Sequence, residues 1–504
     1  MTVTMTQTTG APTSATTEHP WRALFALCIG FFMLLVDMTI VTVATPDIMA
    51  ELDASANAVL WVTSAYMLTY AIPVLIMGRL GDRFGPKWVY LAGLAVFTVS
   101  SLWCGLAGSI ESLVAARAVQ GLGAAMMTPQ TMATITRIFP SERRGSAMAL
   151  WGATAGIATL VGPLAGGALV AAGGWEWIFF VNVPIGVVAI VLNWILVPRL
   201  ETHAHVFDWL GVVLSGVGMF CVVFGLQNGE QRGWDLLTWA LVIGGVAIMG
   251  LFVWWQARNR KEPLVPLHIF TDRNFSVSSL AISTMGFAAV AQGFPLMLYA
   301  QLVRGYTALE ASLLLVPMAA VSFVAAPFVG RLTDRMHPRL LTGAAFFLCS
   351  VSLFWLSVPM TVDSPLWQLL LPMAVFGLGS AAVWSPLAAT ATRNVPMRVA
   401  GAGSGVYNAT RLVGSVIGSA AVAVLIDLRL NAHGLGGSLA GGHENATGSA
   451  IPPAVASKFA ESMSEVMLLP AVALAVGFVA VLFFTTPRHM AKPASPAAPA
   501  SPAV

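Results

Sequence analysis

Long apolar runs separated by short polar stretches constrain this chain more than any other feature of its sequence. Only 9% of the residues are charged and 57% are hydrophobic, whereas ordinary soluble domains carry about 25% charged residues. A soluble fold could not bury that much apolar surface. The sequence therefore predicts an all-α membrane protein in which most residues face lipid or neighbouring helices.

Helices of roughly 17 to 25 apolar residues are long enough to cross a bilayer. The sequence contains fourteen such runs, which we number as spans 1 to 14. Their approximate cores are residues 23–45, 58–78, 88–107, 112–135, 146–170, 177–197, 209–227, 238–256, 275–300, 309–330, 340–360, 366–390, 400–427 and 464–486.

The positions of Lys and Arg predict the orientation, because cytoplasmic loops are enriched in these residues. With a cytoplasmic N-terminus, most of the 25 Lys and Arg residues fall in cytoplasmic loops, and only Arg232, Arg304, Arg429 and Lys458 fall in outer loops. The bias predicts a multi-pass protein with both termini in the cytoplasm. The N-terminus lacks a basic segment before a short apolar core, so we expect no cleaved signal peptide.

One loop segment occurs twice. Gly78-Arg-Leu-Gly-Asp82-Arg83-Phe-Gly85-Pro-Lys87 joins spans 2 and 3, and Gly330-Arg-Leu-Thr-Asp334-Arg335-Met-His-Pro-Arg339 joins spans 10 and 11. Similar Gly-Leu-Gly segments lie in spans 4 and 12. Both pairs are eight spans apart, so a duplicated six-span half with two spans inserted between the copies explains the pattern. Two related halves of this kind are a transporter architecture.

This duplication predicts five regions. We expect a disordered cytoplasmic N-terminus at 1–20, an N-terminal six-helix bundle at 21–200, two extra spans at 201–262, a C-terminal six-helix bundle at 263–486 and a disordered cytoplasmic tail at 487–504. Within the second bundle, residues 428–463 are rich in Gly, Ala and Ser and are predicted to form a long, mobile extracytoplasmic loop.

Further motifs occur in a fixed order along the chain. Span 1 contains Asp37-Met-Thr-Ile-Val-Thr-Val-Ala-Thr-Pro, span 4 contains Arg117-Ala-Val-Gln120-Gly-Leu-Gly, and span 5 contains Gly156-Ile-Ala-Thr-Leu-Val-Gly162-Pro163-Leu-Ala-Gly166-Gly167. The stretch Trp175-Glu-Trp-Ile-Phe-Phe-Val-Asn182-Val-Pro-Ile-Gly follows span 5. Together with the duplicated loop, this order resembles the fourteen-span drug/proton antiporters of the major facilitator superfamily.

The resemblance implies a major facilitator fold, with two six-helix bundles plus two extra transmembrane helices, in a bacterial inner (plasma) membrane. It also implies a proton-coupled secondary active exporter of lipophilic, often cationic compounds that works by alternating access. The expected partners are a lipophilic small molecule, protons and membrane lipids. We expect no cofactor and a functional monomer.

Asp37 is the acidic residue that lies well inside a predicted span. A carboxylate in hydrocarbon costs several kcal/mol unless it is paired, hydrated or protonated. Burial favours the protonated form and a nearby cation favours the charged form, so such a group can take up and release a proton. The alternative is a structural aspartate that makes hydrogen bonds at a helix kink or contact.

Arg117 is the predicted partner of Asp37. Counting about 1.5 Å per helical residue from the span ends places the two at nearly the same depth. The duplicated half has Met373 at the position of Arg117, so we expect proton handling in the N-terminal half alone. Arg117 could instead reach the outer headgroups or brace span 1.

The duplicated loops are interpreted as conformational latches. Asp82 and Asp334 precede the next span, where a carboxylate can accept backbone N–H groups at the helix N-terminus. The bases Arg83, Lys87 and Arg335 can contact anionic lipid or lock the loop to another helix. Topology signals alone would explain these bases, but they would not explain the Asp residues or the glycines, Gly78 and Gly85 in the first copy.

The glycines of span 5 allow close approach of another helix, and Pro163 permits a bend. This pattern suits a helix that lines a gate between the halves, with ordinary small-residue packing as the alternative. Side chains that could line a substrate cavity are Trp61, Tyr66, Gln120, Met127, Trp384, Tyr407 and Arg411. For any single one of them, packing or lipid contact is the alternative.

Several other functions have no sequence support. The four cysteines lack metal-ligand spacing, no basic face suits nucleic acid, and no phosphate-binding loop indicates an ATPase. No membrane-level cluster of His, Glu or Asp suggests an embedded enzyme, and the cytoplasmic loops are too short for a signalling domain. The remaining alternatives are export of an endogenous metabolite or lipid and, in second place, proton-coupled import of a nutrient.

Overall fold

The computed structural model describes residues 19–54, 56–140, 143–202, 208–229, 232–259, 263–435 and 453–485. In these ranges all regular structure is helical. The N-terminal half contains α1 (Pro20–Glu51), α2 (Ala56–Ala71), α3 (Val74–Phe84), α4 (Pro86–Gly105), α5 (Ile110–Ile138), α6 (Arg144–Gly173), α7 (Trp177–Phe180) and α8 (Asn182–Leu196), followed by α9 (Trp209–Asn228) and α10 (Leu236–Arg258).

The C-terminal half begins with the 3-10 turn η1 (Leu267–Thr271). It continues with α11 (Arg273–Ala291), α12 (Gly293–Leu298), the π-helical turn η2 (Tyr299–Val303), α13 (Ala308–Leu313), α14 (Val316–Arg335), α15 (Pro338–Ser357), α16 (Leu366–Arg393), the 3-10 turn η3 (Met397–Val399), α17 (Ala400–Ala432) and α18 (Pro453–Val481). The tail predicted at 487–504 and nearly all of the N-terminus predicted at 1–20 lie outside the described residues.

The helices account for every predicted span. Eleven helical segments in the described ranges are long and apolar enough to cross a membrane, and α2 with α3 forms a further span that is bent by 46°. Two further helices, α5 with 29 residues and α6 with 30, are also long enough to cross. The described helices therefore fit the fourteen-span prediction.

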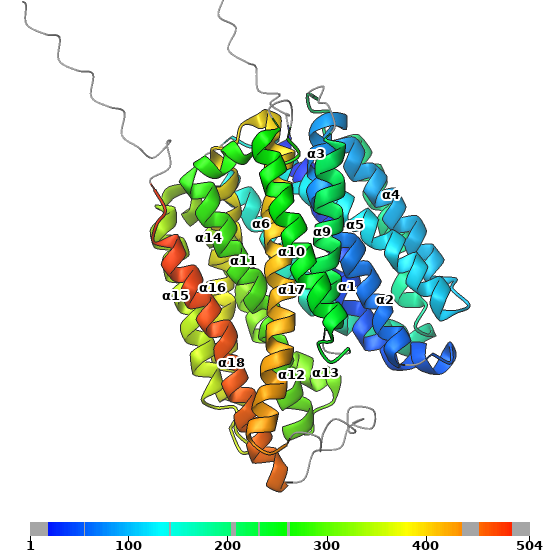
Figure 1. Cartoon of the computed structure of the whole chain (residues 1–504), viewed down its shortest axis with the longest axis vertical. Helices are drawn as coiled ribbons and strands as arrows, with labels where there is room; N and C mark the ends of the chain where they lie inside the picture. The colour runs from blue at the N-terminus through cyan, green and yellow to red at the C-terminus, as the bar shows by residue number, and fades with distance from the viewer. Residues whose placement is uncertain are drawn as a thin grey trace, which may run out of the picture.

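The helices form two bundles with a hairpin beside them (Figure 1). Helices α1 to α8 pack mainly on one another, as do α11 to α18, while α9 and α10 pair with each other. The hairpin contacts α2 of one bundle and α17 of the other, partly through the rings of Trp61 and Phe224, whose centroids are 5.8 Å apart. It therefore lies over one of the seams between the bundles.

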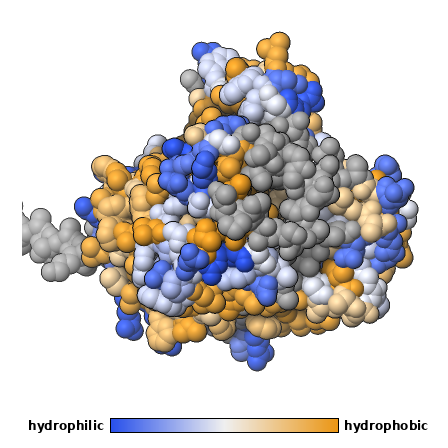
Figure 2. All heavy atoms as spheres, turned by 90° about the horizontal axis from the view of Figure 1, so that it is seen from below, coloured by the Kyte–Doolittle hydropathy of each residue, from blue (hydrophilic) through white to orange (hydrophobic). Residues whose placement is uncertain are grey.

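The two ends of the molecule differ in how the bundles meet. We call the end that carries residues 19 and 485 the terminal end; it is at the top of Figure 1. There α17 packs along α3, but it makes few contacts with α2, the other half of the same bent span. On this side of the molecule the bundles are therefore joined mainly toward the terminal end. Figure 2 shows the opposite end, where hydrophilic and hydrophobic residues are interspersed.

The loop predicted at 428–463 is wrong at both of its edges. Helix α17 continues to Ala432, and α18 begins at Pro453. The residues of α18 that are buried here are spaced as on one face of a helix: Ala456, Phe459, Ala460 and Met463. Polar residues alternate with them in the sequence, and for this reason the segment was predicted as a loop. Arg429 also pairs with Glu465 at 3.2 Å. The centre of the predicted loop, 436–452, lies outside the described residues.

Asp208 ties the hairpin to the chain that follows it. Its carboxylate accepts hydrogen bonds from the backbone N–H of Gly211 at 3.0 Å, from Trp255 Nε1 at 2.9 Å and from Gln256 Nε2 at 2.7 Å. Burial opposes the charge, but these bonds and one from the N–H of Leu264 outweigh it and lower the pKa of Asp208. One side chain therefore caps α9 and fixes the end of α10 beside it.

We expect Asp208→Ala to lower the melting temperature of the detergent-purified protein, because loss of a helix cap alone costs about 1–2 kcal/mol. The contribution of Asp208 is present above the ordinary aspartate pKa of 3.8 and is lost as the pH falls through its lower folded-state value. Differential scanning fluorimetry measures the shift. Asp235→Ala is the control, because half-exposed Asp235 caps α10 and its partners, Arg232 and Thr238, are close to it in sequence. An equal shift in both variants would contradict the role of Asp208 in joining α9 to α10 and the chain after it.

Candidate functional site

Asp37 lies at the centre of a buried polar cluster. Its Oδ2 pairs with Arg117 Nη1 at 2.5 Å, and its Oδ1 accepts hydrogen bonds from Gln120 Nε2 at 3.0 Å and Asn182 Nδ2 at 2.9 Å. Asp37, Arg117 and Gln120 are completely inaccessible to solvent. The structure therefore brings together the two residues predicted to lie at one depth, and surrounds the carboxylate with donors.

Other groups hold Arg117 in position. Its Nε donates to the carbonyl oxygen of Val62 at 3.2 Å, and its Nη1 also donates to Gln120 Oε1 at 2.7 Å. Its guanidinium carbon lies 4.2 Å from the centre of the Tyr66 ring, a distance at which the ring attracts the cation. Of the two alternatives to proton handling considered from the sequence, the buried Arg117 does not reach the outer headgroups, but it does contact span 1 through Asp37.

Asn182 and Ser101 complete the cluster, although no sequence pattern predicted a role for either. Asn182 is the first residue of α8, and its Nδ2 donates to Ser101 Oγ at 3.0 Å as well as to Asp37. Ser101 Oγ in turn donates to the carbonyl oxygen of Phe179 at 3.0 Å. The stretch Trp175–Gly186 contained Asn182 as part of a family-like motif, but nothing in the pattern indicated that its amide would face span 1.

The chemistry of this cluster is that of a carboxylate in a dry interior. All its side chains come from the N-terminal bundle, on α1, α2, α4, α5 and α8. The groups that donate hydrogen bonds to Asp37 in the described ranges are all N–H groups, from Arg117, Gln120 and Asn182. Arg117 Nη2 has no hydrogen-bond partner. A proton added to Asp37 would remove the charge that compensates Arg117.

No metal centre overlaps this cluster. Among the described residues, one group of three side chains could hold a metal ion: His433, Glu461 and Glu465. His433 follows the last residue of α17, and the two glutamates lie in the first half of α18. His433 is 3.5 Å from Glu465, which already pairs with Arg429. This group acts as an ion-pair cluster that joins the two helices.

The first signature loop binds the other bundle. Asp82, in the last turn of α3, accepts the backbone N–H groups of Gly401 and Ala402, both at 2.8 Å, at the start of α17. It also pairs with Arg137 at 2.5 Å. A side chain at Gly78 would collide with the backbone of Gly401, so glycine is needed for the close approach of α3 and α17.

The second copy makes the reciprocal contact. Asp334, in the last turn of α14, accepts the backbone N–H of Gly145 at 2.8 Å and of Ser146 at 3.2 Å, and the Ser146 hydroxyl at 2.7 Å. These residues begin α6 in the N-terminal bundle. Ser385 of α16 adds a hydrogen bond to the Gly145 carbonyl oxygen at 3.0 Å.

We predicted that Asp82 and Asp334 would each cap the N-terminus of the helix that follows it in sequence, and this prediction is wrong for both. Each carboxylate binds the N-terminus of a helix in the opposite bundle. The local sequence could not indicate this, because Asp82 already lies in the last turn of its own helix and its side chain points across the seam. A helix N-terminus carries partial positive charge and free N–H groups, which a carboxylate stabilises.

The remaining signature residues have separate roles. Gly85 has φ +92 at the turn between α3 and α4, a conformation that favours glycine. Lys87 donates to the carbonyl oxygens of Trp194 at 2.7 Å and Val197 at 2.6 Å, so it caps the end of α8 and does not face lipid. Arg83 lies 5.2 Å over the Phe84 ring, and Arg335 is exposed.

The glycines of span 5 face two different partners. Gly156 on α6 lies opposite Ser322 of α14 in the other bundle, whereas Gly162 lies against Thr39 of α1 in its own bundle. The helix remains regular through Pro163 to Gly173. Gly166 is buried and Gly167 is half-buried. The first half of α6 thus lines the seam, and the second half packs on the helix that carries Asp37.

The residues proposed for a substrate cavity fall into separate environments. Tyr66 and Gln120 belong to the Asp37 cluster, and Met127 is completely buried in the core. Trp61 faces the hairpin through Phe224. These residues are not gathered around one space.

Three of the proposed cavity residues come from the C-terminal bundle. Arg411 Nη2 donates to the Tyr70 hydroxyl of the N-terminal bundle at 3.3 Å, and Trp384 lies beside Gly152 of α6. The buried hydroxyl of Tyr407 has no hydrogen-bond partner. Arg411 and Trp384 therefore lie where the two bundles meet, and their role in substrate binding stays a prediction.

Comparison with known proteins places the chain in a family. Residues 27–419 match the model of the Major Facilitator Superfamily. The human organic anion transporter MFSD10 (TETRAN) has a similar structure, with a TM-score of 0.64 and 12% sequence identity over 91% of this chain and 100% of that chain. At this identity the likeness establishes the fold alone.

Relatives found by sequence share a higher identity with this chain. An uncharacterized MFS-type transporter of Mycobacterium tuberculosis is 51% identical over 92% of this chain and 81% of its own length. The tetracenomycin C resistance and export protein of Streptomyces glaucescens is 33% identical over 83% and 78%. Further relatives at 30–32% identity are named multidrug resistance or export proteins. The chain therefore belongs to the major facilitator superfamily of membrane transporters, among relatives named for drug resistance and export.

Proposed function

We propose that this protein is a proton-coupled exporter of lipophilic, often cationic compounds, with Asp37 as its proton-carrying group. The observation that carries the proposal is the buried cluster in which Asp37 contacts Arg117, Gln120 and Asn182. An ionisable residue at membrane depth usually marks an ion pathway. The drug-export names of the relatives support the substrate class.

The joined end of the bundles supports alternating access. In the proposed orientation the terminal end is cytoplasmic, so the structure corresponds to a state closed toward the cytoplasm. Asp82 and Asp334 stabilise this state through helix N-termini of the opposite bundles. Breaking these contacts would let the bundles separate on the cytoplasmic side, where the substrate enters.

The proposed coupling follows from the charges. A proton that reaches Asp37 from the outer side removes its charge, frees Arg117 to move and favours rearrangement of the bundle. Release of that proton into the cytoplasm restores the ion pair. One proton moving inward across 100 mV supplies about 2.3 kcal/mol, which sustains a gradient of roughly fortyfold for a neutral substrate.

We expect Asp37→Asn to abolish protonophore-sensitive efflux of ethidium from energised cells, because an amide has the shape of the carboxyl group but cannot carry the proton. Fluorescence of preloaded cells measures the efflux, with expression matched to the wild type. Asp363→Asn is the control, since Asp363 lies in the loop before α16 and should leave efflux unchanged. Full efflux by Asp37→Asn would refute the assignment of Asp37.

Inside-out vesicles test the direction of transport. Export predicts that ethidium accumulates in vesicles when a proton gradient is imposed, and that added substrate dissipates the gradient in the wild type but not in Asp37→Asn. Flux in the opposite direction would favour the nutrient-importing alternative.

If Asp82 and Asp334 hold the cytoplasmic side closed, replacing either of them should let that side open more often. We expect Asp82→Asn and Asp334→Asn each to weaken closure by about 1.5–3 kcal/mol, because each replaces hydrogen bonds made by a charged group with neutral ones. The population open on the cytoplasmic side should rise roughly tenfold or more. Electron paramagnetic resonance distances between spin labels on the cytoplasmic ends of α3 and α17 measure this change. Unchanged distance distributions in both variants would contradict the latch role.

A further inference from the structure

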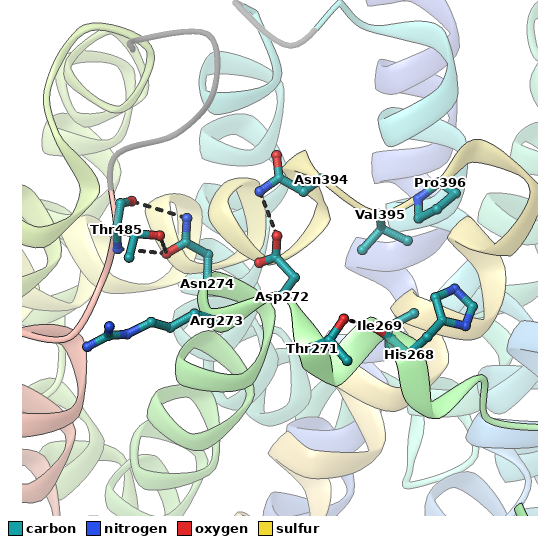
Figure 3. A pocket seen from close by; sticks show the side chains of 10 residues that line it. All are labelled: His268, Ile269, Thr271, Asp272, Arg273, Asn274, Asn394, Val395, Pro396 and Thr485. Atoms are coloured by element: carbon teal, nitrogen blue, oxygen red, sulfur yellow. Dashed lines mark hydrogen bonds between the residues drawn. The ribbon is translucent and has the colours of Figure 1, made fainter. Parts of the chain in front are cut away.

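A polar pocket and an apolar groove meet at Arg273, the first residue of α11. The pocket has a volume of about 520 Å³ and lies at the terminal end, where His268, Asp272, Asn274, Asn394 and Thr485 line it together with Arg273 (Figure 3). The groove has a volume of about 670 Å³ and runs between α11 and α18, with Arg273 at one end. Arg273 lines both spaces.

The groove is suited to an acyl chain. Its walls are apolar side chains of two membrane-spanning helices: Val277 and Leu280 of α11, and Val472, Val476, Val479 and Phe483 at the end of α18. Leu280, Val472, Val476, Val479 and Phe483 are each more than half exposed in the protein alone. The distance from Val472 to Phe483 along a helix is roughly 16 Å. In the membrane, hydrocarbon must cover this surface, and its hollow shape fits one chain.

Arg273 supplies a positive charge beside the groove. Its guanidinium carbon lies 5.6 Å over the Phe483 ring, and within the part of the chain that the structure describes it forms no ion pair with a carboxylate. The neighbouring Asp272 is occupied: Oδ1 accepts from the N–H of Phe275 at 2.9 Å and Oδ2 from Asn394 Nδ2 at 2.7 Å. In Figure 3 the Arg273 side chain extends toward α18.

The pocket beside Arg273 suits an uncharged, hydroxylated group. Asn394 and Asp272 bond to each other, and Asn274 bonds to the backbone of Thr485 through the Thr485 N–H at 2.9 Å. Each of these oxygens has more than one lone pair, so hydroxyl groups of a ligand can still donate hydrogen bonds to them. A ligand that fills both spaces would carry an apolar chain, then a negative charge, then a polar head.

We propose that this site binds an anionic phospholipid with a hydroxylated headgroup, such as phosphatidylglycerol, from the leaflet at the terminal end. The acyl chain lies in the groove between α11 and α18, the phosphate pairs with Arg273, and the headgroup enters the polar pocket. Because α18 is the last described helix of the C-terminal bundle and α11 the first, the lipid joins the two ends of that bundle. The site depends neither on proton coupling nor on the exported compound.

Native mass spectrometry of the full-length protein in detergent tests this site, with phosphatidylglycerol and phosphatidylcholine as probes. We expect wild type to retain phosphatidylglycerol more tightly. Arg273→Gln should weaken phosphatidylglycerol binding about fivefold, which corresponds to about 1 kcal/mol for one basic residue near anionic lipid, and should leave phosphatidylcholine unchanged. Arg258→Gln is the matched control, because Arg258 is exposed at the end of α10 and lies over the Trp254 ring at 4.8 Å.

A second variant tests the groove. Ala475→Leu places a larger side chain in the groove and should weaken the binding of both lipids, because both use an acyl chain. Equal losses in Arg273→Gln and Arg258→Gln would show that only general surface charge attracts the lipid, and would overturn the proposal. Unchanged binding in Ala475→Leu would also overturn it, because the headgroup alone would then hold the lipid.

Discussion

A carboxylate with no access to water cannot remain charged in this protein unless neighbouring groups replace the lost hydration. Asp37 meets that condition through Arg117, Gln120 and Asn182, and the condition fixes much of the N-terminal bundle. The helices α1, α5 and α8 must approach closely enough for these side chains to touch, and Tyr66 of α2 covers the guanidinium group. A cluster whose stability depends on one charge is also one that a single proton can change.

The duplicated loops also use carboxylates that are stabilised by N–H groups, but here the contacts run between the two bundles. Buried Asp82 and half-buried Asp334 each bind the start of a helix that belongs to the other half, so each bundle supplies both a carboxylate and a helix N-terminus to the seam. The reciprocity follows from the duplication. Because all four partners lie at the terminal end, the two contacts close that end together and leave the opposite end unconstrained by them.

Lipid completes the structure at the end of the C-terminal bundle. Exposed apolar side chains on α11 and α18 have no protein partner among the described helices, and Arg273 adds a charge where the groove reaches the membrane surface. In the N-terminal bundle, by contrast, the base at the end of α8 is used inside the protein, because Lys87 donates to the carbonyl oxygens of Trp194 and Val197.

The sequence by itself determined the membrane class and the duplication, and it predicted fourteen spans that the described helices fit, because apolar length, charge bias and repeated motifs are properties of the chain alone. It also predicted the pairing of Asp37 with Arg117, since both depths follow from helical rise. Only the tertiary structure decided which helix N-terminus each signature aspartate binds, that Asn182 completes the cluster, and that Trp61 faces the hairpin. These contacts join residues far apart in sequence, and they depend on how helices are placed and rotated against one another, which the apolar pattern of a membrane span does not specify.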